Sequence, residues 1–304
     1  MKKMTLFFSI IVLLIFSESM ASAKAKPLQL NADGNLLTDM KSPVVINNTS
    51  FVPVRVIESL GGYQVGWNSR SKTITVTDKA DGDSLQLIVG NNVALKNNKK
   101  ISLSTPPVMK DGTTYVPLRF ISENFNAIVD WDSKNNGIAI LKPDRNAQKL
   151  IQSGDLAKAR LGVIELRRVQ FYVSKDRPEG ESFIYIFPEN DFSKMYFIWS
   201  DSIYYYELKN SYMSLVWEGK KTIPKLDGTH NPLSKYLGGD VKSIWGEQPA
   251  VTKRLVFFND NSASVGMRGE YGIIDTKGNV VVSHKVISAK QLADLIVNVQ
   301  EEKK

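Results

Sequence analysis

The feature that most constrains the fold of this sequence is an internal repeat in its first half. Residues 43–67 align without gaps to residues 107–131 at an offset of 64, and nine of the twenty-five positions are identical. The identical pairs are Pro43/Pro107, Val44/Val108, Thr49/Thr113, Val52/Val116, Pro53/Pro117, Arg55/Arg119, Ile57/Ile121, Val65/Val129 and Trp67/Trp131. Self-similarity at a fixed offset predicts that the chain uses one supersecondary unit twice.

Each repeat predicts a tight hairpin at its start. Asn47-Asn48 and Asp111-Gly112 lie between short β-prone runs, and these residues tolerate the positive φ that a two-residue hairpin turn requires. A tight β-hairpin is therefore expected just before the shared proline of each repeat.

The shared prolines, Pro53 and Pro117, predict a switch from strand to helix. Proline has no N–H to donate to a strand, and its fixed φ suits the first turn of a helix. Gly61-Gly62 is expected to end the first helix. Apolar residues at spacings of three or four give each helix one buried face: Val54, Ile57 and Leu60 in the first, and Leu118, Ile121 and Phe125 in the second.

Two strands are expected to follow each helix. The first contains Val65 and Trp67, or Val129 and Trp131; after a polar turn at 68–71 or 132–135, the last strand runs through 73–76 or 137–140. The predicted fold class is α+β, with two small β-β-α-β-β modules at residues 27–78 and 84–142, each a helix on an antiparallel sheet.

The stretches at 51–76 and 115–141 resemble the copper amine oxidase N-terminal domain family, also called the stalk domain. The resemblance rests on an aromatic-Val-Pro-Val/Leu-Arg run, a short helix, and a Trp-Asp/Asn strand and turn, and it covers roughly residues 27–142. Asn68 stands where Asp is usual, and Asn124 and Asn126 stand where Leu and Gly are common, which predicts a less regular end of the second helix. The resemblance implies a small non-catalytic module of surface or secreted bacterial proteins.

Copper chemistry is not expected despite the family name. An amine oxidase requires three imidazoles on copper and a modified tyrosine, whereas the chain has only His230 and His284, both outside the resembling region. No cofactor is predicted.

The shared arginines leave two interpretations open. Arg55 is three residues before Glu58 and Arg119 is four before Glu123, so intrahelical ion pairs are possible. The alternative is an anionic ligand bound at the start of the helix. Because both repeats place the arginine two residues after the proline, the sequence favours a structural tether.

The shared tryptophans, Trp67 and Trp131, also leave two interpretations open. The sequence favours core or half-buried anchors over platforms on which a sugar would stack.

The first 23 residues predict a cleaved signal peptide. Lys2 and Lys3 are followed by an apolar run at 6–16 and by Ala21-Ser22-Ala23, with cleavage expected after Ala23. The run is shorter than the ~20 residues that span a bilayer, so no integral membrane span is expected after cleavage. The absence of cysteine excludes a lipoprotein anchor, disulfides and thiol catalysis.

Residues 143–168 predict a helical connector, and 169–304 predict a β-rich domain. One or two helices are expected there, broken at Ser153-Gly154-Asp155. An antiparallel meander follows, with strands expected at 169–173, 183–187, 195–199, 203–208 and 212–217 and turns at 188–191, 200–201, 209–210 and 218–220. After a loop-rich stretch at 222–250, further strands are expected at 254–258, 263–267, 271–274 and 280–283. The segment 268–286 resembles one WG-type hairpin, and a last helix is expected after Ser288, with a Ser288–Gln291 capping box.

Catalytic signatures are few. Ser283 and His284 are adjacent in a predicted strand and therefore point to opposite faces. His230 and the pair Glu189 and Asp191 fall in predicted turns, and Asp78, Asp81 and Asp83 lack the remaining ligands of a calcium loop. No catalytic or metal residue is predicted, and Pro53, Arg55, Trp67, Pro117, Arg119 and Trp131 are predicted as structural motif residues.

These observations predict a secreted or envelope-associated, non-enzymatic protein whose two modules attach or position a β-rich binding domain. The net charge of +8 favours an ordinary solubilising surface, and loose attraction to an anionic cell envelope is the alternative. The expected partner is an anionic cell-wall polymer or another envelope protein. The sequence has no basic stripe with interleaved aromatic residues, so nucleic-acid binding is not expected. The tyrosine-rich strands at 204–206 and 212 are a candidate binding surface, and a secreted hydrolase with an unrecognised C-terminal site is the alternative function.

Overall fold

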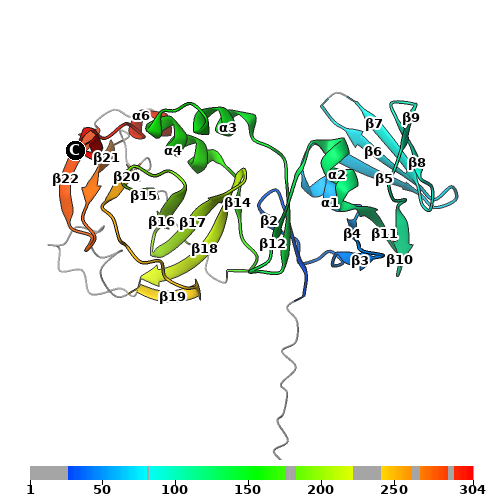
Figure 1. The fold of residues 1–304 in the computed structure, drawn as a ribbon, viewed down its shortest axis with the longest axis horizontal. Helices are drawn as coiled ribbons and strands as arrows, with labels where there is room; N and C mark the ends of the chain where they lie inside the picture. The colour runs from blue at the N-terminus through cyan, green and yellow to red at the C-terminus, as the bar shows by residue number, and fades with distance from the viewer. Residues whose placement is uncertain are drawn as a thin grey trace, which may run out of the picture.

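The computed structural model describes residues 27–80, 82–174, 178, 183–221, 241–261, 268–286 and 291–303. The fold is α+β and mostly β, with several antiparallel sheets, which confirms the predicted class (Figure 1). The predicted signal peptide and His230 lie outside the described residues. Within them, no helix is long and apolar enough to cross a membrane.

The elements of the N-terminal part are β1 (Gln29–Ala32), β2 (Asn35–Leu36), β3 (Val44–Ile46), β4 (Thr49–Pro53), α1 (Val56–Ser59), β5 (Tyr63–Asn68), β6 (Thr73–Asp78), β7 (Ser84–Ile88), β8 (Val93–Lys96), β9 (Lys99–Ser102), β10 (Val108–Lys110), β11 (Thr113–Pro117), α2 (Leu118–Phe125), β12 (Ile128–Asp132) and β13 (Gly137–Leu141). The two segments of the predicted repeat have the same order of elements, β3-β4-α1-β5-β6 and β10-β11-α2-β12-β13.

Both predicted hairpin turns are confirmed. Asn47, Asn48, Asp111 and Gly112 all have positive φ, between 48° and 73°. Gly61 and Gly62 also have positive φ and follow α1, as expected for a helix stop. The turn residues therefore carried a reliable local signal.

The strands of each predicted module do not form one sheet of their own, which corrects the expected arrangement. The two hairpins pair with each other through β4 and β11, with Val52 opposite Val116, in the order β10-β11-β4-β3. Strands β5 and β6 instead join β7–β9 in a five-stranded sheet, and β13 pairs in parallel with β1. An edge strand presents unpaired N–H and C=O groups. Here strands from outside each predicted module pair with those groups: β11 pairs with β4, and β1 pairs with β13.

One apolar core serves both segments. It contains Ile57 and Leu60 from the first segment and Ile121 and Phe125 from the second, together with Leu87 of β7. The helix faces predicted from sequence are buried, except that Leu118 is only partly so. Residues 27–141 thus pack around a common interior.

A second, smaller core joins the N-terminal part to the C-terminal part. Strand β13 is buried on both faces, and its Ala139 and Leu141 pack with Phe171 and Tyr212. The Tyr212 hydroxyl donates a hydrogen bond to Asp130 Oδ2 at 2.6 Å. Burial and this hydrogen bond raise the pKa of Tyr212 above its ordinary value.

The C-terminal elements are α3 (Arg145–Ile151), α4 (Leu156–Glu165), β14 (Arg168–Val169), β15 (Phe183–Pro188), β16 (Lys194–Trp199), β17 (Ser202–Lys209), β18 (Tyr212–Lys221), β19 (Val241–Gly246), β20 (Leu255–Asn261), β21 (Arg268–Ile274), β22 (Val280–Val286), α6 (Leu292–Leu295) and a 3₁₀ turn at Gln300–Lys303. Strands β15–β18 form the predicted meander within a nine-stranded sheet. Helices α3 and α4 lie along one side of this sheet (Figure 1).

Four local predictions for this part are wrong. Residues 218–220 are not a turn, because β18 runs through them with a bulge opposite β19, and Gly219 instead allows close approach of the Trp217 ring. Strand β19 lies in the stretch expected to be loop, and β14 (Arg168–Val169) covers only one of the five residues predicted at 169–173. The last helix begins after Gln291, whose capping box is with Asp294. Ser288 and residues 263–267 lie outside the described residues.

Candidate functional site

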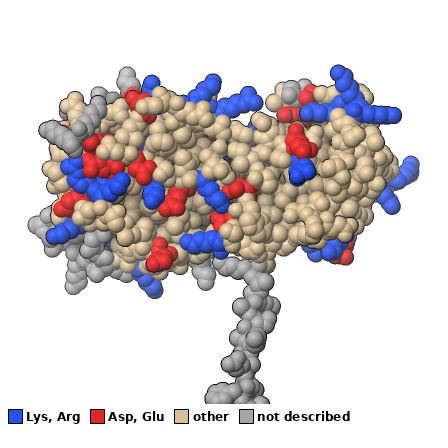
Figure 2. All heavy atoms as spheres, viewed as in Figure 1, with Lys and Arg blue, Asp and Glu red and all other residues tan. Residues whose placement is uncertain are grey.

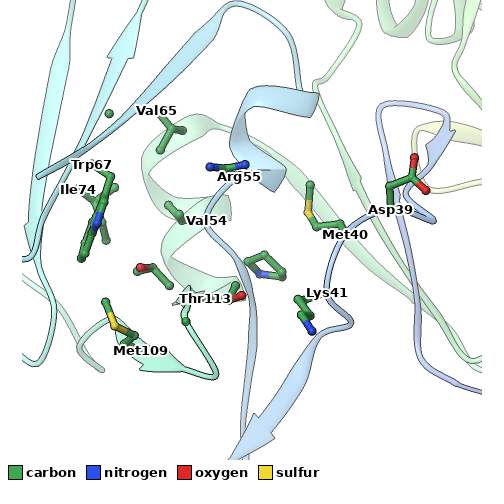
Figure 3. Close-up of a pocket in the computed structure, with 14 residues that line it drawn as sticks. Asp39, Met40, Lys41, Val54, Arg55, Val65, Trp67, Ile74, Met109 and Thr113 are labelled. Carbon is green, nitrogen blue, oxygen red and sulfur yellow. The ribbon is translucent and has the colours of Figure 1, made fainter. Parts of the chain in front are cut away.

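Arg55 and Trp67 line the same groove, although they belong to different elements. Arg55 lies between β4 and α1, and Trp67 is on β5. Figure 3 shows Arg55 between Trp67 and Val65 on one side and Met40 and Asp39 on the other. The groove has a volume of about 430 Å³.

Pairing of the two hairpins builds the opposite wall of this groove. Because β11 pairs with β4, the β10–β11 hairpin brings Met109, Gly112 and Thr113 opposite β5 (Figure 3). The connection after β2 adds Asp39, Met40 and Lys41. The site therefore depends on contacts between the two repeated segments.

The predicted intrahelical ion pairs are absent from the structure, which contradicts the tether interpretation. Neither Arg55 with Glu58 nor Arg119 with Glu123 is among the ion pairs of the described residues. Glu58 Oε1 instead accepts a hydrogen bond from the Val65 N–H at 3.0 Å. Both guanidinium groups are exposed, and Arg55 faces the groove.

Neither shared tryptophan is in the core. Trp67 is 45% exposed and Trp131 is 50% exposed, so the core interpretation is wrong and each indole is at most half-buried. The two tryptophans lie on the edge strands β5 and β12. The residue after each one, Asn68 or Asp132, accepts a hydrogen bond from a backbone N–H of the turn that follows, that of Arg70 or Asn135. Trp131 lies near the C-terminal part, where its carbonyl accepts a hydrogen bond from Lys209 Nζ at 3.2 Å.

The prolines mark the expected switch in both segments. Pro53 is the last residue of β4, and Pro117 is the N-cap of α2 with an extended ψ of 140°. Pro53 also lines the groove, as do the apolar residues Val54 and Ile74. Pro117 and Arg119 are in the corresponding positions of the second segment.

Sequence reasoning did not find Lys41, Met109 or Thr113 as groove residues. Met109 is 45% exposed, and Lys41 is exposed as well. The only available signal was the period-two pattern of the β10–β11 hairpin, which places Met109 and Thr114 opposite each other. It does not say which other strand faces them.

The groove combines an indole and a thioether with two cationic groups. Trp67 and Met109 supply exposed apolar area, whereas Arg55 and Lys41 supply positive charge beside the single carboxylate of Asp39. Figure 2 shows Lys and Arg among Asp and Glu on the face in view, rather than one continuous basic surface. An anion would therefore be attracted to individual sites such as this groove, and not to an extended basic surface.

Comparison with protein families identifies the N-terminal part of the chain. Residues 31–140 match the family model described as the copper amine oxidase N-terminal domain. These residues form a copper amine oxidase N-terminal domain. The match confirms the resemblance expected for residues 27–142, and it includes both walls of the groove. No curated protein matches the chain.

The residues of this copper amine oxidase N-terminal domain do not fit a copper centre. The matched region contains neither histidine nor cysteine. Among the described residues, no group of three or more His, Cys, Asp or Glu side chains is placed to hold a metal ion. Nitrogen and sulfur donors are the ligands that copper prefers. No chemical step is therefore assigned to copper.

The tyrosine-rich strands are not an exposed surface, which corrects another expectation. Tyr204, Tyr205, Tyr206 and Tyr212 are all buried. Burial raises the pKa values of Tyr204's neighbours Tyr205 and Tyr206 above the ordinary phenolic value. A surface of four exposed phenols is not present on β17 and β18.

The C-terminal carboxylates and histidine considered for catalysis all have structural partners. Glu189 pairs with Arg254, and Asp191 Oδ1 accepts hydrogen bonds from Ser193 N–H and Oγ. His284 Nε2 lies 3.2 Å from Glu301 Oε1. The hairpin expected at 268–286 is present as β21 and β22, while membership of the WG-type family stays a prediction.

Proposed function

We propose that this chain is a secreted, envelope-associated binding protein whose copper amine oxidase N-terminal domain attaches to an anionic cell-wall polymer. The groove beside Trp67 and Arg55 carries the proposal. An exposed indole suits the apolar face of a sugar ring, and an arginine with no ion-pair partner among the described residues suits a phosphate or carboxylate. The small core shared by Phe171 and Tyr212 supports the positioning of the C-terminal domain by the attached part.

The proposal is of binding and not of catalysis. Among the described residues, the groove is lined by one carboxylate, Asp39, and by no histidine, whereas general acid–base chemistry uses a pair of groups with separated pKa values. Secretion follows from the predicted signal peptide. Amine oxidation is not proposed, because the full chain has two histidines and a copper amine oxidase requires three imidazoles on its copper.

The experiment is a pull-down of the full chain, without its predicted signal peptide, on isolated bacterial cell wall at rising salt. Trp67→Ala and Arg55→Gln are each expected to weaken retention by roughly fivefold to tenfold, which corresponds to about 1 kcal/mol per lost contact. Arg55→Gln is also expected to reduce the dependence on salt, because it removes a charge from the contact.

Trp131→Ala and Arg119→Gln are the matched controls, since they change the corresponding residues of the second segment. They are expected to retain wild-type binding. Equal losses in all four variants, or none in any, would contradict the assignment of the groove.

A further inference from the structure

A second concave site lies between the N-terminal and C-terminal domains, where the β16–β17 part of the large sheet meets the β1–β2 hairpin. Its volume is about 660 Å³, within the range of small-molecule sites. Five aromatic side chains line it: Tyr172, Phe197, Trp199, Tyr204 and Tyr206. Asn35 and Thr38 of the N-terminal domain line its other side.

The aromatic lining follows from the alternation of the strands. Phe197 and Tyr204 are directly opposite each other on β16 and β17, with ring centroids 6.0 Å apart. Tyr204 and Tyr206 share one face of β17, and Tyr205 packs in a separate core on the other face. Phe197 and Tyr204 therefore form a row of side chains across the sheet, and Glu218 on β18 continues it, because Glu218 is directly opposite Tyr204.

Unpartnered polar atoms gather around this cavity. The buried side-chain atoms that lack a hydrogen-bond partner among the described residues are Arg168 Nε, Tyr172 Oη and Glu218 Oε2. Arg168 and Tyr172 line the cavity directly. Glu218 is only 1% exposed and is connected to the cavity through Ser174, whose hydroxyl donates to Glu218 Oε1 at 2.9 Å.

Such atoms need an explanation, because nearly all buried polar groups in folded proteins have a partner. Arg168 is held in place by stacking on the Phe197 ring, 4.4 Å from its centroid, and Tyr172 by stacking on Trp245 at 5.0 Å. Both polar groups are thus fixed before any ligand arrives. A fixed donor, a hydroxyl and flat aromatic walls then meet in one space.

We propose that this cavity binds a neutral sugar ring. A sugar hydroxyl can accept from Arg168 Nε and donate to the oxygen of Tyr172 or Ser174, while a C–H face of the ring stacks on Trp199, whose side chain is only partly buried. A simple anion could accept from both Arg168 and the Tyr172 hydroxyl, but it would approach the buried Glu218 carboxyl and would make no use of the aromatic walls. An aromatic hydrocarbon would leave all the polar atoms unpartnered.

The test is an array of neutral mono- and oligosaccharides probed with the full chain, followed by calorimetry on each sugar retained. Trp199→Ala and Tyr172→Phe are each expected to weaken binding by roughly tenfold, about the effect of one lost stacking contact or hydrogen bond. Tyr172→Phe removes a single hydroxyl, so it remains informative if Trp199→Ala does not fold. Retention of monosaccharides would identify a free sugar, and retention of oligosaccharides alone a glycan chain.

Tyr205→Phe is the matched control, because it removes a hydroxyl from the other face of the same sheet. It is expected to bind as the wild type does, as is the groove variant Trp67→Ala, which separates this site from the proposed wall-binding groove. Failure of every neutral sugar to bind, or unchanged binding by both Trp199→Ala and Tyr172→Phe, would overturn the proposal.

Discussion

Replacing Glu302 with glutamine is expected to lower the free energy of unfolding by about 3–5 kcal/mol, the range for a buried ion pair that loses one partner. The Arg160 guanidinium and the Glu302 carboxylate are both buried and form two hydrogen bonds, at 2.8 and 2.6 Å. Glu302 Oε1 also accepts from the Asn190 N–H at 2.9 Å. Glutamine would leave the buried charge of Arg160 without a counter-ion.

The location of this pair explains why its loss should affect the whole C-terminal domain. Arg160 belongs to α4 and stacks against Phe187 of β15 and Phe258 of β20, at 5.3 and 5.8 Å from the ring centroids. The pair therefore fastens the C-terminal 3₁₀ turn to a helix and to the middle of the sheet.

Urea denaturation followed by circular dichroism measures the effect. Glu301→Gln is the matched control, because this neighbour lies on the same turn and its side chain is about one-third exposed. It should cost less than about 1 kcal/mol, as exposed ion pairs do. A loss of less than about 1 kcal/mol for Glu302→Gln would contradict the account of the buried pair.

Replacing Glu218 with glutamine is expected to change how stability depends on pH. Burial raises the pKa of Glu218 from 4.5 to about 7, and the positive charge of Lys220 offsets this only in part. Between these values the folded chain keeps a proton that the unfolded chain has lost. The wild type should therefore lose stability as the pH rises from about 4.5 through 7, by about 3 kcal/mol from this one group.

Glutamine does not titrate, so Glu218→Gln should gain stability relative to the wild type over the same pH range. The measurement is the difference in unfolding free energy between the two proteins at pH 5 and pH 8. Glu123→Gln, which makes the same replacement at an exposed position, is the control. A difference between Glu218→Gln and wild type that is constant across pH would show that the Glu218 carboxyl is not buried as described.

Local chemistry made much of the N-terminal domain predictable. Positive-φ residues at 47–48 and 111–112 gave the hairpins, and the apolar face of Ile57 and Leu60 gave the first helix. In the C-terminal part, alternation and turn residues gave the strands of the meander. These features depend on neighbours within a few residues, which a single sequence contains.

Pairing between distant segments was not predictable in the same way. Nothing local in Val52 or Val116 indicates that their strands pair with each other rather than close a sheet within each module. The groove beside Trp67 arises from that pairing, so its Met109 wall was missed. Likewise, Arg160 and Glu302 are 142 residues apart, and their charges alone resemble ordinary surface residues.

Half-exposed positions were difficult for a different reason. A tryptophan in a period-two strand fits either face of a sheet, and only the packing of other segments decides which face is covered. Trp67 and Trp131 are both on uncovered positions, although most large aromatic residues of this chain are buried. Tyr204 and Tyr206 are buried for the same reason, in the core that includes residues of α3 and α4, whereas Tyr205 is buried in a separate core on the other face of the sheet.

The most direct test of wall attachment is the indole N–H signal of Trp67 in ¹H–¹⁵N NMR spectra of the full chain titrated with purified teichoic acid. The groove predicts that the Trp67 signal moves on titration, that Arg55→Gln reduces the movement at equal concentration, and that the Trp131 signal stays in place. A Trp67 signal that does not move, or a Trp131 signal that moves as far, would contradict attachment through the groove.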